Sequence, residues 1–305
     1  MNRGILYAAG AYLCWGLLPL YWKALHDVPV FETMAHRIVW ALLVALVLVA
    51  ARRHWGGLGA AFRSGRTLVT FAASALLLSV NWFVYIWAVN TGHIVETSLG
   101  YFINPLVNVL LGVLFLKERL RLPQGAAVAV ALGGVLYLTV EYGAFPWIAI
   151  TLALSFGVYG LLHKLAPLNA LDGFAFETLL MTPPALAFLA YQEMAVGGAF
   201  VHAGPDITAL LVGAGLVTAV PLLLFSAGAR RIQLTTLGIL QYIAPTMQFL
   251  LGVLVYGEPL TPQRLVGFCL IWLALAIYTV DGIRRSRAAH SSRLVEQPMA
   301  ASSAE

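Results

Sequence analysis

Apolar stretches long enough to cross a lipid bilayer recur along nearly the whole of this 305-residue chain. A helix needs roughly 20 mostly apolar residues to span the hydrocarbon core. The alternation of apolar and polar residues that indicates β-strands is absent, so the pattern predicts an all-α polytopic membrane protein. The expected spans are residues 4–24, 31–51, 67–89, 94–116, 124–140, 146–163, 172–190, 206–228, 234–256 and 263–281.

Charged residues make up only 10% of the chain, whereas soluble domains carry about 25%. The chain has too little charge to cover a surface that faces water, so the lipid bilayer is its expected partner. The formal net charge is +5, but the basic residues lie in short segments between spans, where they determine topology. No nucleic-acid partner is predicted.

Known enzyme and cofactor motifs are missing from the sequence. It has no G-x-x-x-x-G-K-[ST] phosphate loop, no H-E-x-x-H zinc motif and no G-x-S-x-G nucleophile motif. Its two cysteines, Cys14 and Cys269, lie in distant apolar spans and are interpreted as packing residues. We therefore predict no enzyme activity, no cofactor, no metal site and no ATP-driven pump built on this chain alone.

Lysine and arginine residues predict the orientation. Of the 18 basic residues, Lys23 and Arg264 lie in one set of alternating segments, Arg37 lies within a span, and all others lie in the opposite set. That set comprises Arg3, residues 52–66, 117–121, Lys164, residues 230–231 and the C-terminal segment. Because cytoplasmic loops are enriched in Lys and Arg, both termini are predicted to be cytoplasmic, with an even number of spans.

The chain also repeats itself. The segment INPLVNVLLGVLFLKERL at 103–120 aligns with IAPTMQFLLGVLVYGEPL at 243–260, with a shared proline, glycine and glutamate in one register. Each half carries five spans, an odd number, so the second half is predicted to be inverted relative to the first. Inverted repeats are typical of secondary transporters. The predicted halves are residues 4–141 and 146–281, followed by a polar, disordered cytoplasmic tail at 286–305.

Six segments carry a resemblance to a known family. They are WGLLPLYWK (15–23), AHR (35–37), NWFVYIWAVN (81–90), ETSLGYFINPLVN (96–108), LQYIAPTMQFLLGVLVYGEP (240–259) and IWLALAIYTVD (271–281). Over about residues 1–285 the chain resembles the RarD group of EamA-domain proteins, within the drug/metabolite transporter superfamily. The resemblance implies ten helices in two EamA repeats, a bacterial inner-membrane location, and export or exchange of small amphipathic metabolites or drugs.

Polar side chains inside the second span are functional candidates, because charge at bilayer depth is costly. Glu32 and His36 are four residues apart and share a helix face, and Arg37 follows directly. One interpretation is an anion or proton site. The alternative is that Glu32 lies in the outer headgroup zone and pairs structurally with Arg37.

Three other spans combine amides with aromatic residues. This combination favours a cavity for amphipathic ligands, although the amides could instead join helices. The prolines Pro105 and Pro245, at matching positions of the two halves, interrupt helix hydrogen bonding and either point to the binding region or are packing kinks. The predicted substrate-binding residues are His36, Arg37, Asn81, Tyr85, Tyr101, Asn104, Gln241, Tyr242 and Gln248.

A proton route needs a titratable residue inside the membrane, and His36, Glu96 and Glu177 are the candidates. The two carboxylates lie near helix starts, where they could instead occupy the interface or accept free backbone N–H groups. Glu118 and Glu258 are expected to anchor loops. The predicted function is secondary transport of small molecules. The alternatives are a channel-like facilitator, or a membrane sensor or scaffold. The oligomeric state is left open.

The predicted topology is testable with reporter fusions. Fusions in the segment 52–66 should report the cytoplasm, and fusions in the segment 191–205 should report the opposite side, because the second half is predicted to be inverted. Alkaline phosphatase and green fluorescent protein reporters distinguish the two compartments. The same compartment for both segments would contradict the inverted repeat.

Overall fold

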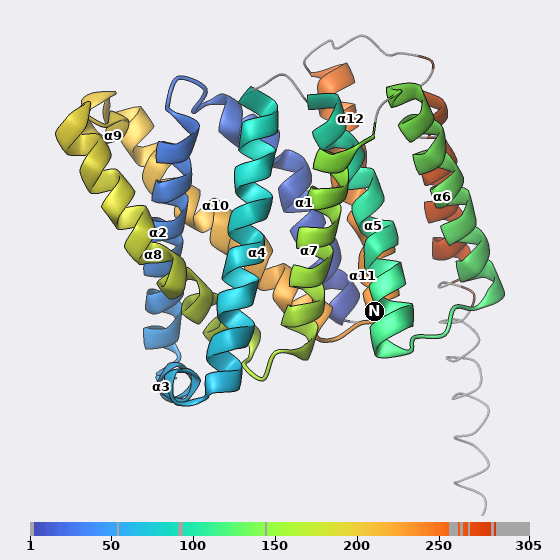
Figure 1. Cartoon of the computed structure of the whole chain (residues 1–305), viewed down its shortest axis with the longest axis horizontal. Coiled ribbons are helices and arrows are strands. Elements are labelled where there is room, and N and C mark those ends of the chain that lie inside the picture. Colours follow the sequence, from blue (N-terminus) through green and yellow to red (C-terminus); the bar gives the residue numbers. More distant parts are fainter. Residues whose placement is uncertain are drawn as a thin grey trace, which may run out of the picture. The chain divides into compact units, whose positions relative to one another are not determined.

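A computed structural model describes residues 3–53, 55–90, 94–143, 145–255, 262, 265–267, 269–281 and 284. Every regular element within these residues is a helix, and eight helices are long and apolar enough to cross a membrane. The all-α membrane fold is therefore confirmed (Figure 1). Ten spans and an inverted repeat remain predictions. Glu258 and the tail at 286–305 lie outside the described residues.

The chain forms two compact units. The first contains most of the helices, namely α1 (Arg3–Lys23), α2 (Val30–Ala51), α3 (Gly56–Arg63), α4 (Gly65–Asn90), α5 (Ile94–Leu116), α7 (Trp147–Leu165), α8 (Ala170–Ala195), α9 (Ala199–His202), α10 (Pro205–Ala229), α11 (Leu234–Gln241) and α12 (Ile243–Leu254). The second contains α6 (Leu122–Tyr142) and an apolar helix at Leu265–Asp281, which are the last helices of the two predicted halves.

The predicted span at 234–256 is two helices, with α11 ending at Gln241 and α12 starting at Ile243. Pro245 explains the break, because its ring clashes with the carbonyl group four residues earlier, which is that of Gln241. Pro105, its counterpart in the first half, lies inside the continuous helix α5. Only the second member of the proline pair therefore coincides with an interrupted helix in the described chain.

Two short helices lie in segments that we expected to be loops. In helix α3, Leu58 and Ala61 are buried and the residues around them are mostly exposed, so the helix packs on the first unit through one apolar face. Helix α9 is a single turn in which Val201 has a φ of 70°. Such a value is uncommon for a β-branched residue and requires support from surrounding contacts.

Close packing of small residues brings the helices of the first unit together. Helix α7 packs against both α4 and α5, and α2 packs against both α8 and α10. Membrane helices approach closely where small residues face a neighbouring backbone. Gly100 of α5 faces Ala149 of α7, and Gly215 of α10 faces the backbone of Trp40 on α2.

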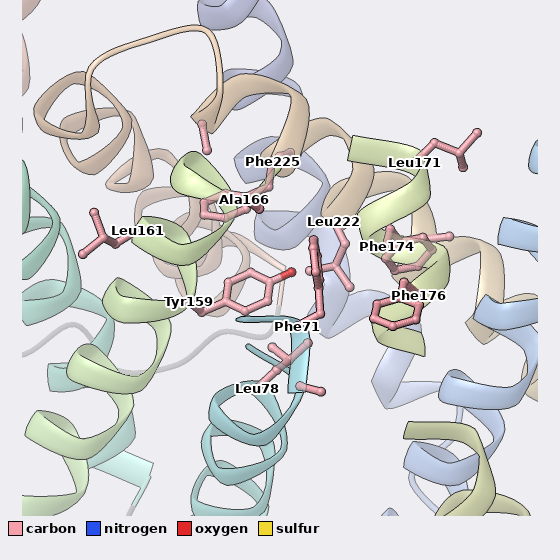
Figure 2. Packing of buried hydrophobic residues seen from close by; sticks show 14 of the residues in the cluster. Phe71, Leu78, Tyr159, Leu161, Ala166, Leu171, Phe174, Phe176, Leu222 and Phe225 are labelled. Carbon is pink, nitrogen blue, oxygen red and sulfur yellow. The ribbon is translucent and has the colours of Figure 1, made fainter. Parts of the chain in front are cut away.

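Buried aromatic residues fill the core between α4, α7, α8 and α10 (Figure 2). Phe71, Tyr159, Phe174, Phe176 and Phe225 each have at most 1% of their surface exposed. The connections α2–α3, α7–α8 and α10–α11 lie along the lower edge of the first unit in Figure 1. Arg52 and Arg230 lie in two of these connections and Lys164 lies in the last turn of α7 before the third, so we call this side the basic end.

In the second unit, polar contacts join the start of α6 to the end of the helix Leu265–Asp281. A guanidinium nitrogen of Arg121 lies 2.7 Å from Oδ2 of Asp281. The amide of Gln124 donates a hydrogen bond of 3.3 Å to the hydroxyl group of Tyr278. Gly134 packs against Leu270, so the two helices are in close contact over several turns.

Replacing Gly215 with alanine should destabilise the first unit. The new Cβ would lie 2.4 Å from both the carbonyl carbon and Cβ of Trp40, and overpacking of this kind typically costs about 1–3 kcal/mol. We expect a lower melting temperature of the detergent-purified protein. Gly133→Ala is the control, because a Cβ at Gly133 meets nothing within 4 Å. Equal melting temperatures for the two variants would contradict the close contact between α2 and α10.

Candidate functional site

A cavity of about 370 Å³ lies inside the first unit. Its walls come from α1, α2, α4, α5, α7, α10, α11 and α12. The lining combines apolar, aromatic, amide and cationic groups. The residues that matter here are Tyr12, Trp15, Trp22, Arg37, Asn81, Trp82, Tyr85, Tyr101, Asn104, Phe156, Thr218, Gln241 and Gln248.

Arg37 provides the positive charge of the cavity. Its guanidinium carbon lies 4.6 Å from the ring centroid of Trp22 and 4.6 Å from that of Trp82. Its Nε donates a hydrogen bond of 3.0 Å to the hydroxyl group of Thr218. Cation–π contacts stabilise a guanidinium without neutralising it. Among the described residues no carboxylate pairs with Arg37, so its charge stays available to a ligand.

Amide side chains line the cavity and also join helices. Asn81 of α4 donates to the carbonyl oxygen of Leu152 and to the hydroxyl of Ser155, both at 2.9 Å on α7. Asn104 of α5 donates at 3.1 Å to the carbonyl oxygen of Ala153. Interhelical bonds of this type contribute roughly 0.6–2 kcal/mol each. The amides therefore fix the positions of α4, α5 and α7 around the cavity.

A second amide contact links α5 to α11. Asn108 is fully buried, and its amide nitrogen donates to Oε1 of Gln241 at 2.8 Å and to Oδ1 of Asn104 at 3.2 Å. Gln248 of α12 donates at 3.2 Å to the carbonyl oxygen of Trp15 on α1. Polar contacts therefore link α5 to α11, and α12 to α1.

Most of the residues predicted to bind substrate line this cavity. The exceptions are His36 and Tyr242. The ring of His36 stacks on Phe200 with centroids 4.8 Å apart. Tyr242 is fully buried and donates at 3.2 Å to the carbonyl oxygen of Phe102. The predicted residues in the lining are Arg37, Asn81, Tyr85, Tyr101, Asn104, Gln241 and Gln248.

The predicted binding residues do not include the tryptophans that contact Arg37. Trp22 lines the cavity together with Trp15, seven residues earlier on α1. A spacing of seven residues places both on one helix face, and this spacing could have indicated their shared role. Thr218 lies in an apolar helix far along the chain, and no local pattern singled it out.

Glu32 does not pair with Arg37. Its carboxylate, 1% exposed, accepts backbone N–H bonds from Ala199 at 2.6 Å and from Phe200 at 3.3 Å. Glu32 therefore holds the start of α9, where free N–H groups favour a negative charge. Glu118 does the same for α11, by accepting N–H bonds from Leu234 and Thr235 at 2.7 and 2.9 Å, so its expected role as a loop anchor is confirmed.

The remaining proton candidates differ in position. The side chain of Glu96 lies outside the described residues, although its backbone belongs to α5. Glu177 is not at the interface, since only 1% of its surface is exposed. Its carboxylate accepts hydrogen bonds from the hydroxyls of Ser74 at 2.5 Å and Tyr159 at 3.3 Å, and lies 3.4 Å from Nε2 of His163. His163 was not among the predicted residues.

Comparison with known proteins gives a consistent result. The EamA-like transporter family matches residues 2–140 and 146–280. Protein RarD of Streptomyces exfoliatus is 45% identical over 286 residues, which cover 94% of this chain and 91% of that protein. The uncharacterized transporter YojE of Bacillus subtilis is 43% identical over 95% of this chain and 98% of its own length. Protein RarD of Escherichia coli is 42% identical, with 94% and 97% covered.

The fold also matches a solved structure, described only as the crystal structure of a protein. That chain superposes with a TM-score of 0.69 and 22% sequence identity, and the match covers 92% of this chain and 98% of that one. At this identity the match supports the fold alone. The family match covers both predicted halves, and the relatives match along almost their full lengths.

Proposed function

Because the chain belongs to the EamA-like transporter family, we propose that it is a secondary transporter that carries small amphipathic metabolites or drugs through the cavity around Arg37. As a RarD-type member it is a multi-pass membrane transporter of the drug/metabolite class. The observation that carries the proposal is the guanidinium of Arg37, which contacts two indole rings and pairs with no carboxylate among the residues that the structure describes.

The chemistry of the cavity supports an aromatic or apolar substrate with an anionic group. Its volume of about 370 Å³ falls within the usual range of small-molecule sites. Trp15, Tyr85 and Tyr101 offer ring surfaces for an apolar body. The amide nitrogens of Asn81 and Asn104 are used in helix contacts, so Arg37 is the strongest donor left for an anion.

The proposed transport cycle is alternating access between two inverted repeats, residues 4–141 and 146–281, with ten helices and both termini in the cytoplasm of the inner membrane. Two similar halves of opposite orientation rock about a site near the bilayer midplane in other transporters. The basic connections along one edge of the first unit support this orientation, because cytoplasmic loops are enriched in Lys and Arg.

The chain has no ATP-binding motif, so we propose that concentrative transport uses a proton gradient. His36, Glu96 and Glu177 remain the proposed coupling residues. His36 and Glu177 are both buried, at 6% and 1% exposure, and buried ionisable groups in membrane proteins are functional candidates by default.

Arg37→Gln should weaken the binding of anionic substrates. A charged hydrogen bond contributes about 1.5–3 kcal/mol, so the apparent affinity for aromatic carboxylates should fall roughly ten- to a hundredfold. Arg37→Lys should have an intermediate effect, because lysine keeps the charge but loses the planar contact with both indole rings. Thermal-shift titrations with aromatic carboxylates and their uncharged amides measure this.

Arg63→Gln is the matched control, since it removes one exposed arginine on α3. It should bind the carboxylates as the unmodified protein does. The uncharged amides should bind all variants equally. If the carboxylates bind Arg37→Gln with unchanged affinity, Arg37 does not recognise the anionic group.

Counterflow separates a transporter from a channel-like facilitator. In reconstituted vesicles preloaded with an aromatic carboxylate found in the titrations, uptake of the labelled compound should saturate and be stimulated by the internal pool, since a carrier returns faster when occupied. Linear, unstimulated uptake would indicate a facilitator. Absence of uptake would favour a sensor or scaffold.

A further inference from the structure

We propose that His163 and Glu177 form a buried proton-binding site that holds the basic end of the first unit closed. The inference rests on the proposed transport function, which it deepens by naming the group that responds to pH. It assigns a role to His163, which lies outside the cavity lining and belongs to no motif of the sequence.

The two side chains lie in a polar cluster built by four helices. Nε2 of His163 on α7 lies 3.4 Å from Oε2 of Glu177 on α8. Nδ1 of His163 lies 2.9 Å from the hydroxyl of Ser226 on α10. The other carboxylate oxygen of Glu177 accepts from Ser74 on α4 at 2.5 Å. The cluster therefore connects α4, α7, α8 and α10 at one point.

Because the pair is buried, its net charge strongly affects the free energy of the closed arrangement. His163 and Glu177 are 3% and 1% exposed, and isolated charges away from water are costly. With one shared proton the pair has no net charge, either as an ion pair or as two neutral groups. Without that proton the pair has a net charge of −1. The closed arrangement therefore favours the pair with one proton bound.

The other charged groups on the four helices are either exposed or bonded to groups other than His163 and Glu177. On α7, Lys164 donates to the carbonyl oxygens of Ala229 and Ile232. On α8, Asp172 accepts from Asn169 at 2.7 Å. The others are Arg66 on α4, Glu193 on α8 and Asp206 on α10, all exposed. The titratable group that faces the pair most directly is Tyr159, whose ring centroid lies 4.3 Å from that of His163.

His163 of the pair lies on α7, between the cavity and the basic end of the first unit. Phe156, Tyr159 and His163 follow one another on α7 at steps of three and four residues, so they share a face. Phe156 lines the cavity, and the fully buried ring of Tyr159 stacks on it with centroids 5.5 Å apart. Lys164, next to His163, contacts the α10–α11 connection at the basic end.

Aromatic packing fills the space around Tyr159. Its ring also stacks on Phe225 of α10, with centroids 5.9 Å apart (Figure 2). The ring of Phe71 on α4 contacts that of His163, with centroids also 5.9 Å apart. The order along α7 is therefore cavity, aromatic layer, proton-binding pair and basic end. Passage from the cavity toward the basic end requires this layer and the pair to separate.

Opening admits water to the pair, and the sign of the pH effect follows. Water stabilises the net charge of −1 that the pair acquires when it loses the shared proton, so losing that proton costs less free energy in the open form than in the closed form. The closed form therefore binds more protons than the open form over the pH range in which the pair loses its proton. Rising pH favours the form that binds fewer protons, so it favours opening, by up to about tenfold per pH unit.

Thiol accessibility tests this without any substrate. Ala229 on α10 is fully buried, three residues after Ser226, and its carbonyl oxygen accepts a hydrogen bond from Lys164, the neighbour of His163. Ala229→Cys in a Cys14→Ala, Cys269→Ala background therefore reports opening at the basic end through labelling by a maleimide. Ala60→Cys on the exposed side of α3 corrects for the pH dependence of thiol reactivity itself. We expect the corrected labelling rate of Ala229→Cys to rise at least severalfold between pH 6.5 and 8.5.

The His163→Gln, Glu177→Gln double variant keeps hydrogen-bonding groups but has no titratable pair, so its corrected labelling should not change with pH. Thr182→Ala removes a buried hydroxyl of α8 that donates to the carbonyl oxygen of Thr178, outside the cluster, and should keep the pH response. All variants should first show a cooperative melting transition. A pH response that persists in the double variant, or is absent from the unmodified pair, overturns the proposal.

The counterflow assay separates this inference from the proposed function. Saturable counterflow together with pH-independent labelling would retain the transporter and reject the proton-binding site. Loss of counterflow from the unmodified protein would reject the transporter, while the labelling result would still report whether the pair controls the closure.

Discussion

A polar group buried between helices has no water to bond with, so the protein itself must supply its hydrogen-bond partner. In this chain, carboxylates remote in sequence meet that need at helix starts. Glu32 accepts the N–H groups at the start of α9, and Glu118 accepts those at the start of α11. Each bond joins segments more than a hundred residues apart. The same contacts that remove unsatisfied groups therefore hold the irregular segments of the first unit in place.

The amides around the cavity also need hydrogen-bond partners within the protein, and they find them on neighbouring helices. Asn81 and Asn104 use their N–H groups to hold α7, and Asn108 holds Gln241. The sequence offered helix contact and cavity wall as alternatives for these amides, but Asn81 and Asn104 do both, since they line the cavity while donating hydrogen bonds to α7. The geometry of the cavity thus depends on the bonds that assemble the helices.

Local patterns predicted the elements well and long-range contacts poorly. Hydropathy located the helices, since spanning length is fixed by the bilayer. The break before Ile243 also follows from a local rule, the clash between Pro245 and the carbonyl group of Gln241, although we expected one span there. Most of the residues predicted to bind substrate do line the cavity, because amide and aromatic residues spaced along one helix face form a local pattern.

Local rules could not predict which side chains of different helices contact one another. Glu32 had a plausible partner in nearby Arg37, and only the folded chain brings the start of α9 to it instead. Arg37 is held by Trp22 and Trp82, from helices before and after its own. Likewise His163 looked like an ordinary residue at a helix end, because its partners Ser226 and Glu177 come from other helices.

The two charged centres of the first unit are stabilised in different ways, and this difference suits them to different ligands. Arg37 contacts two π faces, which do not neutralise it, and no carboxylate in the described part of the chain pairs with it, so its charge suits an anion. His163 and Glu177 compensate each other, so a proton is what changes their net charge. Arg37 lies on α2, and α2 packs along α8, the helix of Glu177. If α2 moves when Arg37 binds an anion, α8 and its Glu177 side chain are therefore directly exposed to that movement.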